Sequence, residues 1–175
     1  FENDNRVILV CHDLYYFRKK YFAKNNQIDS TEITKKQEID VLSKCEYIID
    51  FAHYEYEFLI KNNIEKNKLF FTMTPVKVYE FNYAEKKPYD FFYIGSNWQQ
   101  NIISLTYFFK DLYEFFKNKK VMIVGPRLKN QNFIYSSSLN SSNYFDSKIG
   151  IAPIFEGTGR NVKIFDMMAN SLPVV

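Results

Sequence analysis

The chain has 175 residues, a net charge of +3 and 19% aromatic residues, so it can bury the core of one domain or of two lobes. Its acidic and basic residues are mixed along the chain, whereas nucleic-acid-binding proteins carry a larger and more clustered excess of Lys and Arg. The charge pattern therefore argues against a nucleic-acid partner.

The two cysteines, Cys11 and Cys45, each lie at the edge of an apolar run. This placement is typical of small buried side chains in a reducing compartment, and the spacing of a tetrahedral metal site is absent. No apolar run has the length of a transmembrane helix, and no segment has the pattern of a signal peptide. We therefore expect a cytoplasmic protein. Because the chain begins with Phe1 and stops at Val175 within a strand-like run, we expect it to be part of a longer protein.

The first half predicts a β-α-α-β-α-β order. Residues 6–11 form a β-branched run typical of a strand covered on both faces. His12 and Asp13 follow this strand, and Thr31 is the cap candidate of the second helix. The further predicted elements are helices 14–24, 32–45 and 53–62 and strands 47–51 and 68–73. This order favours a parallel sheet with right-handed crossovers.

The polar stretch from residue 75 to residue 88 has no clear periodicity and separates the chain into two lobes. We place an N-terminal lobe at 1–80, a linker at 81–88 and a C-terminal lobe at 89–175. In the second lobe, Asn97 is expected to cap helix 99–116, whose apolar stripe is Ile102, Leu105, Phe109, Leu112 and Phe116. Its strands are predicted at 90–94, 120–124 and 132–135, before a serine-rich segment at 136–142.

The stretch from residue 149 to residue 175 predicts a buried strand, a Gly-x-Gly turn, a short helix and the start of another strand. The turn, Gly157-Thr158-Gly159, leaves backbone N–H groups uncovered at a helix N-terminus, which favours an anion. Arg160 and Lys163 add positive charge, and Asp166 follows as an acceptor for sugar hydroxyls. The stretch therefore predicts a phosphate site with a carboxylate beyond it.

The predicted strands end at His12, Gly95, Gly125 and Phe155-Glu156. In open parallel sheets, ligands bind beyond the carboxyl ends of the strands. We therefore expect these loops to line one crevice.

These motifs, in this order, resemble retaining glycosyltransferases of the GT-B fold, in family four (group 1). The resemblance rests on Tyr93-Ile94-Gly95-Ser96, Val121-Met122-Ile123-Val124-Gly125-Pro126 and the stretch from Ala152-Pro153 to Val175. Trp98-x-x-Asn101 is similar to a common variant of the loop after the first strand of that lobe. The first half, with Val10-Cys11-His12-Asp13-Leu14 and an acidic helix near Glu55, is similar to the second half of the family's acceptor lobe.

The resemblance implies transfer of a sugar from a UDP- or GDP-linked donor to a glycan, lipid-linked or protein acceptor, with retention and without a metal or cofactor. It implies a catalytic His12 and a diphosphate site made of Gly157, Thr158, Gly159, Arg160 and Lys163. Asp166, Gly125 and Pro126 would contact the ribose or nucleotide, and Gly95, Ser96, Glu156 and Asn161 would line the donor side. No Asp-x-Asp is present to hold a metal ion. Polysaccharide biosynthesis, and a peripheral association of the full-length protein with the inner face of a membrane, are further expectations.

The chain departs from the family pattern at several positions. Asp166 stands where the family has Glu, Ser171 replaces a glycine, and the usual Arg and Lys are missing after Gly95. The first half of the acceptor lobe and the C-terminal helices are also missing, so we expect this fragment alone to be inactive.

Simpler interpretations stay open for the same residues. His12 can be a hydrogen-bonded residue at a strand end, and Asp166 can pair locally. Arg160 and Lys163 can be solvated charges, Glu156 a solvated loop acid, and Gly95 and Gly125 turn glycines. The rival function is a binding module with the GT-B fold that holds a nucleotide-sugar or a partner without catalysis.

Overall fold

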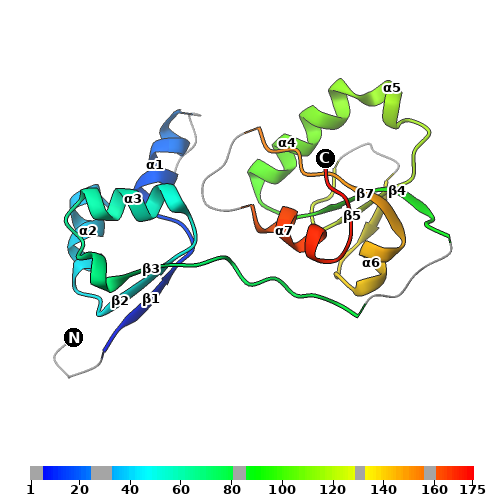
Figure 1. Ribbon diagram of the computed structural model, residues 1–175. Helices are drawn as coiled ribbons and strands as arrows, with labels where there is room; N and C mark the ends of the chain where they lie inside the picture. The colour runs from blue at the N-terminus through cyan, green and yellow to red at the C-terminus, as the bar shows by residue number, and fades with distance from the viewer. Residues whose placement is uncertain (1–5, 25–32, 81–85, 129–132, 156–160) are drawn as a thin grey trace. The chain divides into compact units, whose positions relative to one another are not determined.

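The computed structural model describes residues 6–24, 33–80, 86–128, 133–155 and 161–175. The chain divides into two compact units with a boundary between Thr74 and Pro75, called unit 1 and unit 2 below. Each unit contains a parallel sheet with helices packed on it (Figure 1), which confirms the predicted α/β class with two Rossmann-like parallel sheets. The predicted linker limits stay a prediction, since residues 81–85 lie outside the described residues.

The sheet of unit 1 has the strand order β1-β2-β3, with all neighbours parallel. The elements of unit 1 are β1 (Ile8–Cys11), α1 (Tyr15–Lys24), α2 (Lys35–Ser43), β2 (Tyr47–Asp50), α3 (His53–Lys61), the 3-10 helix η1 (Lys66–Lys68) and β3 (Leu69–Phe71). Helix α2 begins after Thr34, whose hydroxyl accepts from the Gln37 N–H at 3.2 Å, while the Gln37 side chain accepts from the Thr34 N–H at 2.9 Å. This capping box satisfies two N–H groups of the helix start. The cap expected at Thr31 is therefore wrong, and Thr31 itself lies outside the described residues.

The two faces of the sheet in unit 1 are covered differently. One face packs against the three helices through a core of Cys11, Leu14, Leu42, Ile48, Leu59 and Leu69. The opposite face carries Ile8, Val10 and Phe70, which expose 59%, 47% and 51% of their surface. Parallel sheets usually have both faces buried. Among the described residues this sheet has one bare face, so the prediction that the strand at 6–11 is covered on both faces is wrong.

The sheet of unit 2 has the order β6-β5-β4-β7, again fully parallel. The elements of unit 2 are β4 (Tyr89–Ile94), α4 (Gln99–Asp111), α5 (Tyr113–Phe116), β5 (Val121–Val124), β6 (Ile134–Ser136), α6 (Ser141–Phe145), β7 (Ser147–Gly150) and α7 (Val162–Ala169). Apolar clusters lie on both faces, one with α4 and α5 and one with α6 and α7. All four residues of β5 are buried, as expected for a central strand covered on both sides. None of the described helices is both long enough and apolar enough to cross a bilayer.

Three details of unit 2 differ from the sequence prediction. Helix 99–116 is interrupted at Leu112, which leaves helical geometry at ψ 22° and is 42% exposed, while Leu105, Phe109 and Phe116 are buried as predicted. Asn97 does not cap α4, because Trp98 occupies the cap position without a side-chain bond. The serine-rich segment ends in a short helix, α6, that the composition did not indicate.

The segment that follows Thr74 is fastened to the end of α7 by Asn170, whose side chain is 2% exposed. Its Nδ2 donates to the carbonyl oxygens of Lys77 and Asp166, both at 2.8 Å, and its Oδ1 accepts from the Tyr79 N–H at 2.8 Å. A fully hydrogen-bonded buried amide fixes both partners. The connecting segment is therefore held against the helix that carries Lys163 and Asp166.

Candidate functional site

Two glycines follow neighbouring strands of unit 2 and allow their loops to meet. Gly125, after β5, has φ +109°, a conformation that residues with a side chain rarely adopt. A Cβ at this position would lie 1.8 Å from the carbonyl oxygen of Gly95, which follows β4. Gly95 has a steric role of its own, because a Cβ there would lie 2.5 Å from the hydroxyl of Tyr93. Close packing therefore explains the need for glycine at both positions, in agreement with their simpler interpretation as turn glycines. Pro126, which follows Gly125, is buried.

Lys163, the second residue of α7, points its ammonium group at β4 and α4. Its Nζ donates to the Tyr93 hydroxyl at 3.0 Å and to Asn101 Oδ1 at 2.9 Å. Both partners are neutral, and Tyr93 is fully buried. Burial lowers the pKa of Lys163 from 10.5 to about 8. A half-buried ammonium held by neutral oxygens gains strongly from an anion, because no carboxylate among its described partners compensates the charge.

Asp166 lies one turn beyond Lys163, and one of its two carboxylate oxygens already has a hydrogen-bond partner. Its Oδ2 accepts a short hydrogen bond from the hydroxyl of Tyr144, a side chain that is 1% exposed. Burial, followed by this bond to a carboxylate, raises the pKa of Tyr144. The local pairing of Asp166, which the sequence left open, is therefore present, and it fixes the orientation of the carboxylate. None of the described hydrogen bonds involves Oδ1 of Asp166.

The remaining predicted donor-side residues divide between described and undescribed positions. Ser96 is exposed after β4, and Asn161 precedes α7 at its cap position without a side-chain cap bond. Glu156, Gly157, Thr158, Gly159 and Arg160 lie outside the described residues. The structure thus gathers Gly95, Ser96, Gly125 and Lys163 around the ends of β4 and β5.

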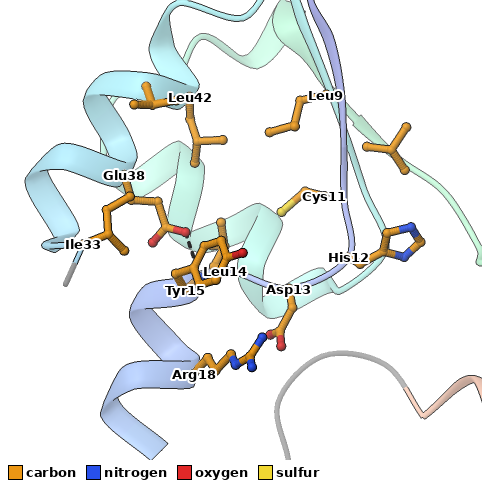
Figure 2. A pocket seen from close by; sticks show the side chains of 12 residues that line it. Leu9, Cys11, His12, Asp13, Leu14, Tyr15, Arg18, Ile33, Glu38 and Leu42 are labelled. Carbon is orange, nitrogen blue, oxygen red and sulfur yellow. Dashed lines mark hydrogen bonds between the residues drawn. The ribbon is translucent and has the colours of Figure 1, made fainter. Parts of the chain in front are cut away.

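His12 lies in unit 1, directly after β1, and its ring is exposed. The ring packs against Phe51 with centroids 5.1 Å apart and planes tilted by 35°. A pocket of about 450 Å³ lies beside this strand end and is lined by β1, the start of α1 and α2 (Figure 2). Its walls are mainly apolar, with Asp13, Arg18 and Glu38 among the polar lining residues.

Two carboxylates hold the chain immediately after His12. Glu38 of α2 accepts from the N–H groups of Tyr15 and Tyr16 at 2.7 and 2.9 Å, the first of which is drawn in Figure 2. Glu55 of α3 accepts from the Leu14 N–H at 3.3 Å. Carboxylates satisfy the free N–H groups of a helix start and interact favourably with its dipole. The turn carrying His12 is therefore fixed by residues distant in sequence, which no local pattern could indicate.

Glu55 belongs to a buried group with Cys11 and Asp50, in which the candidate ligand atoms lie within 4.8 Å of one another. Burial is the main cause that raises the pKa of Glu55 from 4.5 to about 7, and the Asp50 carboxylate adds to it. Burial also raises the pKa of the Cys11 thiol to about 12, so this thiol is protonated near neutral pH. The carboxylates have structural partners as well, since Asp50 Oδ1 accepts from the Ala52 N–H at 2.8 Å.

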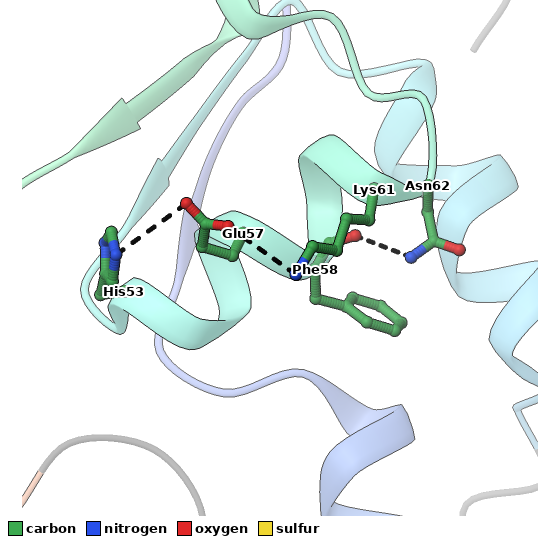
Figure 3. A network of polar contacts seen from close by, with 5 residues as sticks. All are labelled: His53, Glu57, Phe58, Lys61 and Asn62. Carbon is green, nitrogen blue, oxygen red and sulfur yellow. Dashed lines mark hydrogen bonds and ion pairs between the residues drawn. The ribbon is translucent and has the colours of Figure 1, made fainter.

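The other histidine, His53, stands in a surface row along α3 (Figure 3). Its Nε2 lies 3.9 Å from Glu57, which also lies 3.8 Å from Lys61. Exposed pairs of this kind contribute about 0–1 kcal/mol to stability. These contacts give His53 a structural role on the surface of α3.

The sequence did not indicate that tyrosine hydroxyls are the hydrogen-bond partners of Lys163 and Asp166. Tyr93 lies within an apolar run and Tyr144 precedes Phe145, so both appear in the sequence as core aromatics. Their hydroxyls nevertheless contact Lys163 and Asp166. Among the described partners of these two residues, only Asn101 was indicated by the sequence, as the last residue of the Trp98-x-x-Asn101 motif.

The sequence matches no protein-family model and no curated protein. Among solved structures, the chain is similar to TarM with a TM-score of 0.65 and 14% identity, over 98% of this chain and 36% of TarM. It is similar to a mutant of S. aureus TarM in complex with fondaparinux, alpha-GlcNAc-glycerol and UDP with a TM-score of 0.65 and 14% identity, over 97% of this chain and 36% of that one. The chain is also similar to a chain of the GtfA/B complex, with a TM-score of 0.54 and 13% identity, over 97% of this chain and 37% of that chain. The chain thus spans little more than a third of the matched chains, and over that span it has the fold of GT-B glycosyltransferases.

Proposed function

We propose that the protein is a glycosyltransferase that binds a nucleotide-diphosphate-sugar through unit 2. The observation that carries the proposal is the ammonium group of Lys163, held by two neutral oxygens in a half-buried position. An ammonium group has three donors, and its described partners use two of them. A phosphate oxygen would take the third and supply the missing negative charge.

The position of Lys163 supports the same ligand. It lies in the first turn of α7, where N–H groups and the helix dipole favour an anion. Asp166, one turn further, has its Oδ1 outside the described hydrogen bonds, so it would accept from ribose hydroxyls. Gly157, Thr158, Gly159 and Arg160 are proposed to complete the diphosphate site, with Glu156, Asn161, Gly95, Ser96, Gly125 and Pro126 around the donor.

The chemistry follows from the charges that sugar transfer creates. When the bond between the sugar and the diphosphate breaks, negative charge develops on the leaving phosphate and positive charge on the anomeric carbon. A preorganised cation at the phosphate stabilises this change without a metal ion. We propose transfer with retention, as in family four, with His12 as the catalytic residue. The TarM structure with UDP and alpha-GlcNAc-glycerol supports a nucleotide-sugar donor and a glycan-like acceptor.

The setting of the reaction is proposed from the sequence. We place the protein in the cytoplasm, in polysaccharide biosynthesis, with a glycan, lipid-linked or protein acceptor. A peripheral contact of the full-length protein with the inner face of a membrane would suit a lipid-linked acceptor.

Calorimetric titration of the protein with UDP and GDP tests the donor site. Substitution Lys163→Ala should weaken binding by about 1.5–3 kcal/mol, because a charged hydrogen bond to phosphate is lost. Lys110→Ala, which removes an exposed lysine of α4, is the matched control and should leave the affinity unchanged. Equal affinity of Lys163→Ala and the parent protein would refute the phosphate assignment.

A further inference from the structure

The side chain of Asn101 connects the loop after β4 to helix α7. Its Nδ2 donates to the carbonyl oxygen of Ser96 at 3.0 Å and to the Ser96 hydroxyl at 3.2 Å. Its Oδ1 accepts from Lys163 Nζ at 2.9 Å. The amide can take only this orientation, because a flipped side chain would set its NH₂ group against the ammonium and its oxygen against a carbonyl.

A neutral acceptor is chemically distinct from a carboxylate at this position. Lysines that are held by Asp or Glu are already neutralised, and an incoming phosphate must then compete with the resident carboxylate. Tyr93 and Asn101 offer oxygen atoms without charge, so they orient the ammonium and leave its electrostatic attraction intact.

We propose that Asn101 is a positioning residue for donor binding, which presents the Lys163 ammonium to a diphosphate without neutralising its charge. The inference rests on the proposed function and goes beyond it, since it gives a role to a residue outside the predicted phosphate site. Ser96 takes part by fixing the amide, so the loop after β4 and the start of α7 act as one unit.

Two nearly isosteric substitutions separate this role from a merely structural one. Asn101→Asp places a negative charge beside the ammonium, so the pKa of Lys163 rises from its present value of about 8. Asn101→Leu removes the acceptor and adds apolar surface, so the pKa falls further. UDP binding weakens in both variants: roughly tenfold or more for Asp, which repels phosphate, and about threefold to tenfold for Leu, which leaves the ammonium unoriented.

The measurement combines lysine-selective NMR with calorimetry. The pKa of Lys163 is read from its side-chain signals in the parent protein and both variants, with the Lys163→Ala spectrum identifying the resonance. UDP affinity is measured on the same samples. Gln99→Ala, at an exposed position of the same helix, is the control and should change neither quantity.

Opposite pKa shifts in the Asp and Leu variants, with reduced UDP affinity in both, would support the proposal. An Asp variant that binds UDP as well as the parent protein would overturn it, as would pKa shifts of the same sign. Each variant has its own expected direction, so one folded variant is sufficient: a Lys163 pKa that falls in the Asp variant, or rises in the Leu variant, overturns the proposal. If the parent protein bound neither UDP nor GDP, the proposed function would fail, and the two pKa shifts alone would decide whether Asn101 holds the ammonium.

Discussion

The buried carboxyl group of Glu55 makes the stability of unit 1 depend on pH. Glu55 is fully buried, and its carboxyl group accepts hydrogen bonds from the Leu14 N–H and from the Tyr54 hydroxyl, the latter at 3.1 Å. The negative charges of Asp50 and Asp13 also raise its pKa. The perturbation that isolates this group is Glu55→Gln. Its amide oxygen can still accept from Leu14, but the side chain no longer ionises.

The magnitude follows from the difference between two pKa values. In the unfolded chain Glu55 titrates near 4.5, whereas in the folded protein its pKa is raised to about 7. Between these values the folded state binds more protons than the unfolded state, so the free energy of unfolding falls as pH rises through this window. The full difference corresponds to about 3 kcal/mol lost by about pH 8, a loss that the Gln variant avoids.

Urea titrations at about pH 4.5 and about pH 8 test this expectation. Unfolding of unit 1 is followed by pulse-labelling Cys11 and Cys45, the chain's two cysteines, which are both buried in this unit. The exposed neighbour Glu57→Gln is the control and should retain the pH dependence of the parent protein. If Glu55→Gln lost as much stability toward alkaline pH as the parent protein, the assigned ionisation would be wrong.

Two further predictions concern Gly125 and His12. Gly125→Ala should destabilise the protein by about 3–5 kcal/mol in thermal unfolding, because its backbone conformation is strained for alanine and its Cβ overlaps the Gly95 carbonyl; a loss below about 1 kcal/mol would contradict the close approach of the two loops. His12→Ala in the full-length protein should abolish hydrolysis or transfer from a panel of UDP- and GDP-sugars while UDP affinity stays at the parent value, and equal activity of the two proteins would assign His12 a structural role.

Most strands and their parallel order could be predicted, because short apolar runs of β-branched or aromatic residues alternate with amphipathic segments. The buried strand before the Gly-x-Gly turn was expected to end at Phe155, whereas β7 ends at Gly150. The interruption at Leu112 could not be predicted, since Leu112 continues the apolar spacing of the helix although its side chain is exposed. The bare face of the unit 1 sheet was missed for a related reason. A continuous apolar run shows that a strand has two apolar faces and carries no information on what packs against each.

The candidate site was predictable only in part. Lys163 and Asp166 follow a local turn-and-helix pattern, so the sequence could place them on one helix. Their partners Tyr93 and Tyr144 are 70 and 22 residues away, and each hydroxyl is buried at the end of an aromatic ring. Long-range polar contacts of this kind depend on the register of the sheet, which a single sequence does not specify.

The bare sheet face in unit 1 has a practical consequence for handling the polypeptide. Together with Tyr47 of β2, Ile8 and Val10 of β1 and Phe70 of β3 form an apolar strip across the sheet, and β1 is an edge strand among the described residues. Such a strip adsorbs to hydrophobic resins and dyes, and salts excluded from protein surfaces strengthen its association. During preparation, the 175-residue chain should therefore remain dispersed best at low concentrations of sulfate or phosphate, and lysine at position 8 or 70 should improve its recovery without touching the core on the opposite face.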